Sequence, residues 1–199
     1  MRTNSLSVGV TGGIGAGKSI VCVIFSIFGA PVFDADARAR WLMENDPALR
    51  QQISETFGEK AFISGRLNRN WLAGEVFSNN SWLSKLNALV HPLVGSDFEE
   101  WESRHSAFPY VIKEAALLIE TGSYNALDKI VLVTAPETVR INRILKRDTH
   151  RNEEQIRDII QKQLRDEEKE KHADYLLRND GSTLLIPQIL QLHAMFIGR

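Results

Sequence analysis

The chain has 199 residues, of which 43% are hydrophobic and 25% are charged. This composition is typical of soluble globular proteins and excludes fibrous, collagen-like and disordered chains. The formal net charge of −1 gives no general attraction to nucleic acid or to anionic membranes. Cys22 is the single cysteine, which excludes a disulfide framework and favours a reducing compartment. No apolar run reaches the length of about 18 residues that crosses a bilayer, so we expect a cytosolic protein.

The first part of the chain is predicted to fold as strand, turn, helix and strand. Residues 6–10 alternate and then meet glycines, which indicates a buried strand before a turn. Residues 20–28 are apolar on all sides and precede Gly29, which predicts a short buried helix that ends there. Residues 30–33 are predicted as a second strand that ends on the acidic segment Asp34-Ala35-Asp36.

A helical insertion is expected to follow this second strand. Asp46 precedes Pro47, the combination of N-cap and first helical residue, and Gly58 is the expected end of that helix. Residues 59–105 are predicted to be helical and without sheet character. The pair His91-Pro92 should break or kink the last helix of this insertion.

The remaining strands and helices alternate along the chain. Residues 110–112, 130–133 and 175–177 are predicted strands, and Pro136 is placed to open a helix. A final helix over residues 184–196 is expected, with Ser182 or Thr183 as its cap. This alternation predicts a parallel sheet that is covered by helices on both faces.

The segment Gly12-Gly13-Ile14-Gly15-Ala16-Gly17-Lys18-Ser19 satisfies G-x-x-x-x-G-K-[ST] in full, between a predicted strand and a predicted helix. Its glycines let successive backbone N–H groups turn inward around an anion, and the following helix directs its positive end there. Lys18 adds a full charge, and the Ser19 hydroxyl is placed to hold Mg²⁺. The alternative is a glycine-rich turn with a surface lysine. The predicted ATP-binding residues of this loop are Gly13, Gly15, Ala16, Gly17, Lys18, Ser19 and Ile20.

Three classes of nucleotide-binding protein can then be compared. The sequence has neither D-x-x-G nor N-K-x-D, the motifs that a GTPase requires. A motor or remodelling ATPase needs an acid at the end of a hydrophobic strand, and Asp34, Asp36 and Glu114 all satisfy that condition without deciding the matter. A small-molecule kinase needs an acceptor-binding lobe and a mobile basic lid, and the chain has a segment suited to each.

The charged segment late in the chain supplies that lid. Residues 153–171 alternate in charge sign, which favours a solvated helix face over a binding surface. Arg143 and Arg147 differ because they lie four residues apart on one face of the helix that Pro136 opens. Phosphoryl transfer depends on positioning and on neutralising charge, which mobile arginines perform.

At this point the sequence resembles the dephospho-coenzyme A kinase family over nearly its whole length. The nucleotide loop, the segment Asp34-Ala35-Asp36 with Arg40, and the pair His91-Pro92 match motifs of that family. So do Leu117-Leu118-Ile119-Glu120, Arg147-Asp148, and the spaced set Gln163, Lys169, Ala173-Asp174-Tyr175, Asn179 and Gly181. The chain departs from the family pattern at Ala116, where proline is usual, at Ile20, where threonine is common, and at Lys113-Glu114.

The resemblance implies an α/β fold of the P-loop type, with three layers (α/β/α), a five-stranded parallel sheet, a helical acceptor-binding insertion and a lid. It implies one kinase domain, with a core of residues 1–39, 106–139 and 173–199, an acceptor lobe of about residues 40–105 and a lid region of about residues 140–172. The implied reaction moves the ATP γ-phosphate to the ribose 3′-hydroxyl of dephospho-coenzyme A, the last step of coenzyme A biosynthesis. Mg²⁺ is the implied cofactor, and no obligatory protein partner is evident.

The expected residue roles follow from the same comparison together with the residue chemistry. Asp36 is the expected base, with Lys18 and Arg147 sharing the charge on the transferred group. Arg143 and Asn179 are assigned to ATP. The acceptor is assigned to Asp34, Asp36, Arg40, His91 and Glu114.

Plainer interpretations stay open for several of these residues. The two aspartates can form a strand-end turn, and His91 can end a helix. Another acceptor on the same scaffold is the first alternative function. An ATP-binding regulatory module that transfers nothing is the second.

Overall fold

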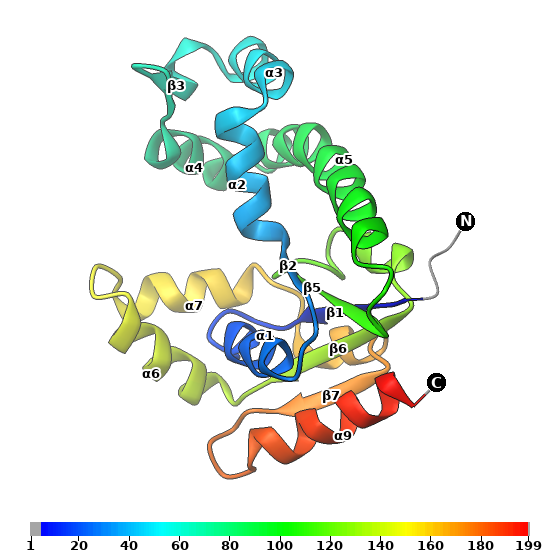
Figure 1. The fold of residues 1–199 in the computed structure, drawn as a ribbon. Helices are drawn as coiled ribbons and strands as arrows, with labels where there is room; N and C mark the ends of the chain where they lie inside the picture. The colour runs from blue at the N-terminus through cyan, green and yellow to red at the C-terminus, as the bar shows by residue number, and fades with distance from the viewer. Residues whose placement is uncertain (1–4, 199) are drawn as a thin grey trace. The chain divides into compact units, whose positions relative to one another are not determined.

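The computed structural model describes residues 5–198, apart from the side chains of residues 77, 78 and 80. The contact pattern divides the chain into two units, Met1–Asp34 with Glu102–Arg199, and Ala35–Trp101. The elements of the first unit (Figure 1) are β1 (Leu6–Thr11), α1 (Lys18–Ile27), β2 (Val32–Asp34), β5 (Tyr110–Glu114), η2 (Ser123–Ala126), β6 (Lys129–Thr134), α6 (Glu137–Arg147), α7 (Glu153–Gln161), α8 (Asp166–Glu170), β7 (Tyr175–Arg178) and α9 (Leu185–Ile197). Those of the second are α2 (Ala35–Asn45), α3 (Pro47–Phe57), η1 (Glu59–Ala61), β3 (Phe62–Ile63), β4 (Arg66–Leu67), α4 (Arg69–Ser78) and most of α5 (Asn80–Arg104).

The first unit is built on a five-stranded sheet in the order β2-β5-β1-β6-β7, with every neighbouring pair parallel. β1 is buried along its whole length, and Ile130–Val133 of β6 is an unbroken apolar run, because both faces of these central parallel strands are covered. The predicted five-stranded parallel sheet is therefore confirmed. The carboxyl ends of β1, β2 and β5 meet at one edge, and this edge positions the site.

Helices α1 and α9 cover one face of the sheet (Figure 1), where Val21, Cys22 and Phe25 pack with Ile189 and Phe196. The other face is covered by α8 and by the segment between β5 and β6. Gly9 of β1 points to this second face, and a Cβ there would meet the side chains of Leu118, Leu127 and Ile130 within 3 Å. The three-layer arrangement therefore rests on close packing of both faces of β1.

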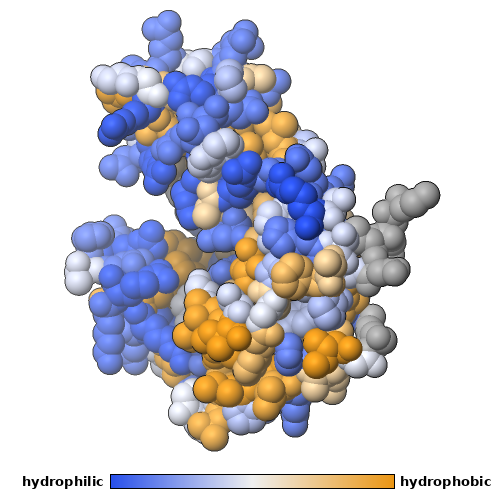
Figure 2. Space-filling model, viewed as in Figure 1, coloured by the Kyte–Doolittle hydropathy of each residue, from blue (hydrophilic) through white to orange (hydrophobic). Residues whose placement is uncertain are grey.

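The prediction that the helix after the nucleotide loop is buried on all sides was wrong. Val21, Cys22 and Phe25 are buried, but Ile20, Val23 and Ile27 are about half exposed or more. Figure 2 shows apolar side chains on this surface, over α1 and α9, whereas α6 and α7 present hydrophilic side chains. A helix that packs on one face of a sheet buries one stripe only, whatever the composition of its other stripe.

The helical unit contains a short hairpin that the sequence analysis did not predict. β3 and β4 pair antiparallel around Ser64 and Gly65, which both have positive φ angles. The predicted absence of sheet character was therefore wrong, because two-residue strands give no periodicity to detect. The helix α5 also continues through Pro92 where a break or kink was expected, so the chain there tolerates the loss of one backbone hydrogen bond.

Helix ends test the capping predictions directly. Asp46 caps α3 through a 2.8 Å hydrogen bond from the Leu49 N–H, as expected. The final helix α9 begins at Leu185 without a side-chain cap, so the predicted cap by Ser182 or Thr183 was wrong. Asp180 instead accepts hydrogen bonds from the backbone N–H groups of both residues. Among the helices of residues 5–198, none is long and apolar enough to cross a membrane.

Candidate functional site

The glycine-rich loop joins the end of β1 to the start of α1 and has the backbone geometry of an anion nest. Gly12, Gly15 and Gly17 have φ angles of 152°, 79° and 99°, which favour glycine. A side chain at Gly12 would collide with the Val133 backbone, because its Cβ would lie 2.3 Å from that carbonyl oxygen. Ala16, which belongs to the loop, is buried, and Ile20 is exposed on the first turn of α1.

Lys18 and Ser19 begin α1, beside the carboxyl ends of β2 and β5. The Lys18 Nζ donates to the Gly12 carbonyl oxygen at 3.0 Å. The Ser19 hydroxyl donates to Glu114 Oε1 at 2.9 Å. Asp34 is the register partner of Glu114 on the neighbouring strand, so two carboxylates and one hydroxyl meet at this edge of the sheet.

Cys22 lies on α1 near the same carboxylates. Burial raises the pKa of the Cys22 thiol, and the nearby Glu114 carboxylate raises it further. A buried thiol with a raised pKa is a poor nucleophile. Cys22 lies in the buried core cluster, as the sequence indicated.

Arg143 and Asn179 hold the loop through its backbone carbonyl oxygens. Arg143 approaches the carbonyl oxygens of Gly15 and Ala16 at 3.5 and 3.4 Å, and donates to Asn179 Oδ1 at 3.2 Å. The Asn179 amide in turn donates to the Ala16 carbonyl oxygen at 2.8 Å. Asn179 approaches Gly17 so closely that a Cβ there would lie 2.2 Å from its Nδ2. Both residues, which the sequence analysis assigned to ATP, thus contact the backbone of the nucleotide loop.

Arg147 lies at the exposed end of α6 and is not in contact with the loop. Its guanidinium makes a two-point ion pair with Asp148, at 2.9 and 3.1 Å. This pairing holds the pKa of the Asp148 carboxyl below its usual range, chiefly through the hydrogen bond from Arg147. The two arginines that the sequence placed on one helix face therefore have different surroundings: Arg143 contacts the loop, and Arg147 is an exposed side chain paired with Asp148.

Three of the predicted site residues belong to the second unit. Asp36 lies in the first turn of α2, two residues after Asp34, and Arg40 is exposed on the same helix. His91 is exposed on α5, directly before Pro92. Within the first unit, the structure brings together Lys18, Ser19, Asp34, Glu114, Arg143 and Asn179.

The donor set at the sheet edge suits a magnesium ion that is shared with phosphate. Across the described residues, no group of three His, Cys, Asp or Glu side chains is placed to hold a metal ion. Mg²⁺ commonly uses one or two protein oxygens together with waters and substrate phosphates. The Ser19 hydroxyl and the Glu114 carboxylate, 2.9 Å apart at the start of α1, fit that kind of site.

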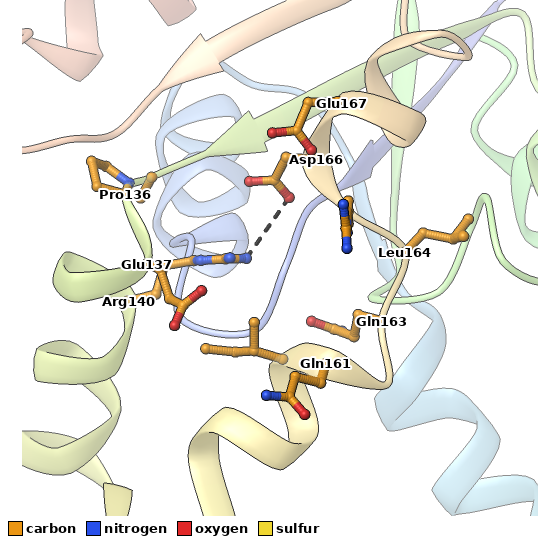
Figure 3. Close-up of a pocket in the computed structure, with 11 residues that line it drawn as sticks. Pro136, Glu137, Arg140, Gln161, Gln163, Leu164, Asp166 and Glu167 are labelled. Atoms are coloured by element: carbon orange, nitrogen blue, oxygen red, sulfur yellow. Dashed lines mark ion pairs between the residues drawn. The ribbon is translucent and has the colours of Figure 1, made fainter. Parts of the chain in front are cut away.

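Sequence reasoning gave no site role to three side chains of the lid region that turn inward (Figure 3 shows two of them). Arg140 is 8% exposed, and Lys169 is fully buried with its Nζ 2.8 Å from Glu120 Oε1. The Gln163 Oε1 accepts a 2.9 Å hydrogen bond from the Ile14 N–H. The available signal for Arg140 was its spacing, because it precedes Arg143 by three residues on the face of α6 that meets the loop.

Comparison with known proteins decides the family. The model of the dephospho-CoA kinase family matches residues 6–184. The chain belongs to the dephospho-CoA kinase family. A dephospho-CoA kinase of Bacteroides fragilis is 37% identical over 190 residues, which cover 96% of this chain and 92% of that protein.

Solved structures show the same fold. A crystal structure of a Thermus thermophilus protein superposes with a TM-score of 0.86 at 34% identity, covering 96% of this chain and 97% of that one. A dephospho-CoA kinase from Campylobacter jejuni has the same fold, with a TM-score of 0.71 at 24% identity and 99% coverage of both chains. This dephospho-CoA kinase family member is thus an ATP-dependent kinase with a P-loop α/β fold, as the sequence motifs predicted.

Proposed function

We propose that the protein transfers the γ-phosphate of ATP to the ribose 3′-hydroxyl of dephospho-coenzyme A, giving coenzyme A and ADP. The observation that carries the proposal is the edge of the sheet where Lys18 and Ser19 face Glu114 and Asp34. A loop that only binds ATP has no need of carboxylates beside the outer phosphates. The family provides the identity of the acceptor.

The loop residues bind and orient the triphosphate. The backbone N–H groups from Gly15 to Ser19, at the start of α1, surround the phosphates with partial positive charge. Lys18 exchanges its bond to the Gly12 carbonyl oxygen for the outer phosphates. Arg143 and Asn179, which brace the outer side of the loop, support the adenosine side of the nucleotide.

Asp36 takes the proton of the acceptor. A ribose hydroxyl is a weak nucleophile until a base removes its proton. The 3′-oxygen then forms a bond to the γ-phosphorus, and the bond from that phosphorus to the bridging oxygen of ADP breaks. The proton goes to the Asp36 carboxylate, and both electrons of the broken bond stay with ADP.

When bound, Mg²⁺ would neutralise negative charge on the phosphates of ATP. Ser19 would hold the ion directly, and Glu114 and Asp34 would hold its water ligands. The Ser19 hydroxyl donates a hydrogen bond to Glu114 Oε1 at 2.9 Å, so the lone pairs of its oxygen are left for a cation.

The second unit is proposed to bind the acceptor, and residues 140–172 are proposed to act as the lid. Arg40 and His91 are the polar side chains of the second unit to which the acceptor is assigned, together with Asp34, Asp36 and Glu114. Arg147 is proposed to leave Asp148 and to stabilise the transferred phosphoryl group. A cytosolic location stays a prediction.

The experiment that tests this function measures ADP release with Mg-ATP, with and without dephospho-coenzyme A. We expect strong stimulation and a product that gains one phosphate at the 3′ position. Coenzyme A is the matched control, because its 3′-oxygen already carries a phosphate. Stimulation only by a different nucleoside or sugar acid would mean that this compound is the acceptor. ATP binding with no transfer to any acceptor would mean that the protein is an ATP-binding regulatory module.

The assignment of the base has its own test. Asp36→Asn should lower kcat by about 10²-fold or more and leave the Kd of ATP nearly unchanged, since general-base catalysis contributes about 10²–10⁴-fold. Asp46→Asn is the control, because Asp46 caps a helix of the same unit and an asparagine still caps. Full activity of the Asp36→Asn variant would remove Asp36 from the mechanism.

A further inference from the structure

A cavity of about 590 Å³ lies between α6, the end of α7 and the start of α8. Figure 3 shows that Arg140 and Gln163 point into it from different elements, and that Arg140 is paired with Asp166 across it. None of the loop-facing residues assigned above to ATP or to the acceptor lines this cavity. The polar side chains that converge here therefore need a different explanation.

Gln163 fixes one point of the nucleotide loop. Its Oε1 accepts the backbone N–H of Ile14 at 2.9 Å, across 149 residues of sequence. The Ile14 side chain packs against the cluster of Ile141, Ile144 and Ile156, which joins α6 to α7. The lid region thus holds Ile14 by its backbone and by its side chain together.

Arg140 fixes the residues on both sides of Ile14. Its Nη1 occupies the space beside Gly13, where a Cβ would lie 1.9 Å away. Its carbonyl oxygen lies 2.8 Å from the position of a Cβ on Gly15. The loop from Gly13 to Gly15 therefore packs closely against the first turns of α6.

The charge of Arg140 is weakly compensated. It is buried, and an arginine keeps its charge when buried. Asp166 at the start of α8 is 3.7 Å away, which is beyond hydrogen-bond range. Among the atoms of residues 5–198, the buried Arg140 Nε has no hydrogen-bond partner. Its position therefore depends on Asp166 and on close packing against the loop.

We infer that Gln163 and Arg140 are positioning residues that hold Gly13–Gly15 in the phosphate-binding conformation, with Asp166 keeping Arg140 in place. They act through the loop and touch neither substrate. Their loss weakens ATP binding and raises the KM for ATP more than it lowers kcat. This inference depends on the proposed function only where turnover is measured.

The Gln163 contact is tested by Gln163→Ala, with the Kd of Mg-ATP and the hydrogen exchange of the Ile14 amide as readouts. Losing one neutral hydrogen bond should weaken ATP binding by about fivefold. The Ile14 amide should exchange faster. Gln163→Glu should restore both, because a carboxylate oxygen still accepts the Ile14 N–H. Gln161→Ala is the matched control, since Gln161 is exposed at the rim of the same cavity.

The Arg140 contact is tested by a double-mutant cycle of Gly13→Ala and Arg140→Met. A new Cβ at Gly13 should displace the guanidinium and weaken ATP binding by about fivefold or more, as removal of a buried polar contact does. In the Arg140→Met background the same change should have little further effect. Asp166→Asn should weaken ATP binding, as Arg140→Met does. Glu167→Gln, at the neighbouring residue of α8, should not. Thermal unfolding of every variant identifies those that fail to fold, and Arg140→Lys then replaces Arg140→Met.

Two results would overturn the inference. One is an unchanged Kd for ATP and an unchanged Ile14 exchange rate in Gln163→Ala. The other is full additivity of Gly13→Ala and Arg140→Met. Failure of the proposed function has a different signature, because the wild-type protein would then bind ATP, respond to these substitutions and still transfer nothing to dephospho-coenzyme A.

Discussion

The nucleotide loop and the lid region are specified by the sequence in different ways. In the loop, the backbone itself does the binding, and any added atom collides with a neighbour at Gly12, Gly15 or Gly17. In the lid region, exposed charges pair with each other, as Arg157 does with Glu153 and Glu137. Backbone constraints leave a fixed motif in the sequence, whereas solvated charges do not. The inward-facing side chains of the lid region therefore cannot be distinguished from the outward-facing ones in the sequence.

The largest expected effect separates the exposed Arg147 from its exposed neighbours. Arg147→Ala should lower kcat by about 10³-fold, since an arginine that stabilises a transferred phosphoryl group contributes at least this much. The Kd of dephospho-coenzyme A should change far less. Arg151→Ala is the control, because Arg151 also pairs with Asp148, at 3.5 Å. Equal losses in both variants would mean that Arg147 has only a local electrostatic role.

The next prediction compares the contributions to stability of two lysines, one in α8 and one directly after it. Lys169 is fully buried and pairs with Glu120 at 2.8 Å, while Lys171 is exposed and pairs with Glu168. Lys169→Met should lower the free energy of unfolding by about 3–5 kcal/mol, because it leaves the Glu120 charge unpaired in the interior. Lys171→Met should change it by less than about 0.5 kcal/mol. Urea unfolding of both variants makes the comparison.

A double variant shows whether the lost charge pair is the cause. Lys169→Met with Glu120→Gln removes both charges, so it should be more stable than Lys169→Met alone. A double variant that is as unstable as the sum of its single changes would point to packing around Lys169 instead.

Two glycines with similar backbone angles sharpen the description of the loop. Gly17 and Gly29 have φ angles of 99° and 90°, so alanine at either position costs about 1–2 kcal/mol of backbone strain. A Cβ on Gly29 meets no atom within 4 Å, but one on Gly17 would displace Asn179 from its 2.8 Å bond to Ala16. Gly17→Ala should therefore weaken ATP binding by about tenfold or more, and Gly29→Ala should leave it unchanged. Isothermal titration with Mg-ATP tests both.

The parts of the fold that follow from periodicity could be predicted from the sequence. The strand β6 contains the unbroken apolar run Ile130–Val133, and its burial on both faces follows from that pattern. The hairpin of β3 and β4 could not be predicted, because strands of two residues leave no alternation. The exposed stripe of α1 was missed because its apolar composition does not say which side meets the sheet.

The site shows the same division. The loop and the strand-end acids Asp34 and Glu114 were identified because motif and strand order bring them to one edge. The role of Gln163 was missed, because its contact with Ile14 across 149 residues leaves no local pattern. The role of Arg140 was missed although it precedes Arg143 by three residues on α6. The pairing of Arg147 with Asp148 was also beyond sequence reasoning, since a neighbouring acid is as common in a solvated pair as in a site.

The smallest expected effect concerns Asp180, which orders the turn directly after Asn179. Hydrogen bonds from the backbone N–H groups of Thr183 and Ser182 lower the pKa of Asp180 from 3.8 to about 2. The folded state thus favours the ionised carboxylate. Its contribution to stability is fully present above about pH 4 and is lost as the pH falls through 2. Asp180→Asn keeps an oxygen acceptor without the charge, so the Tm difference from wild type should be measurable at pH 7 and disappear near pH 2. A difference that is constant from pH 7 to pH 2 would mean that the amide fails as an acceptor, and that the charge of Asp180 contributes nothing to the order of this turn.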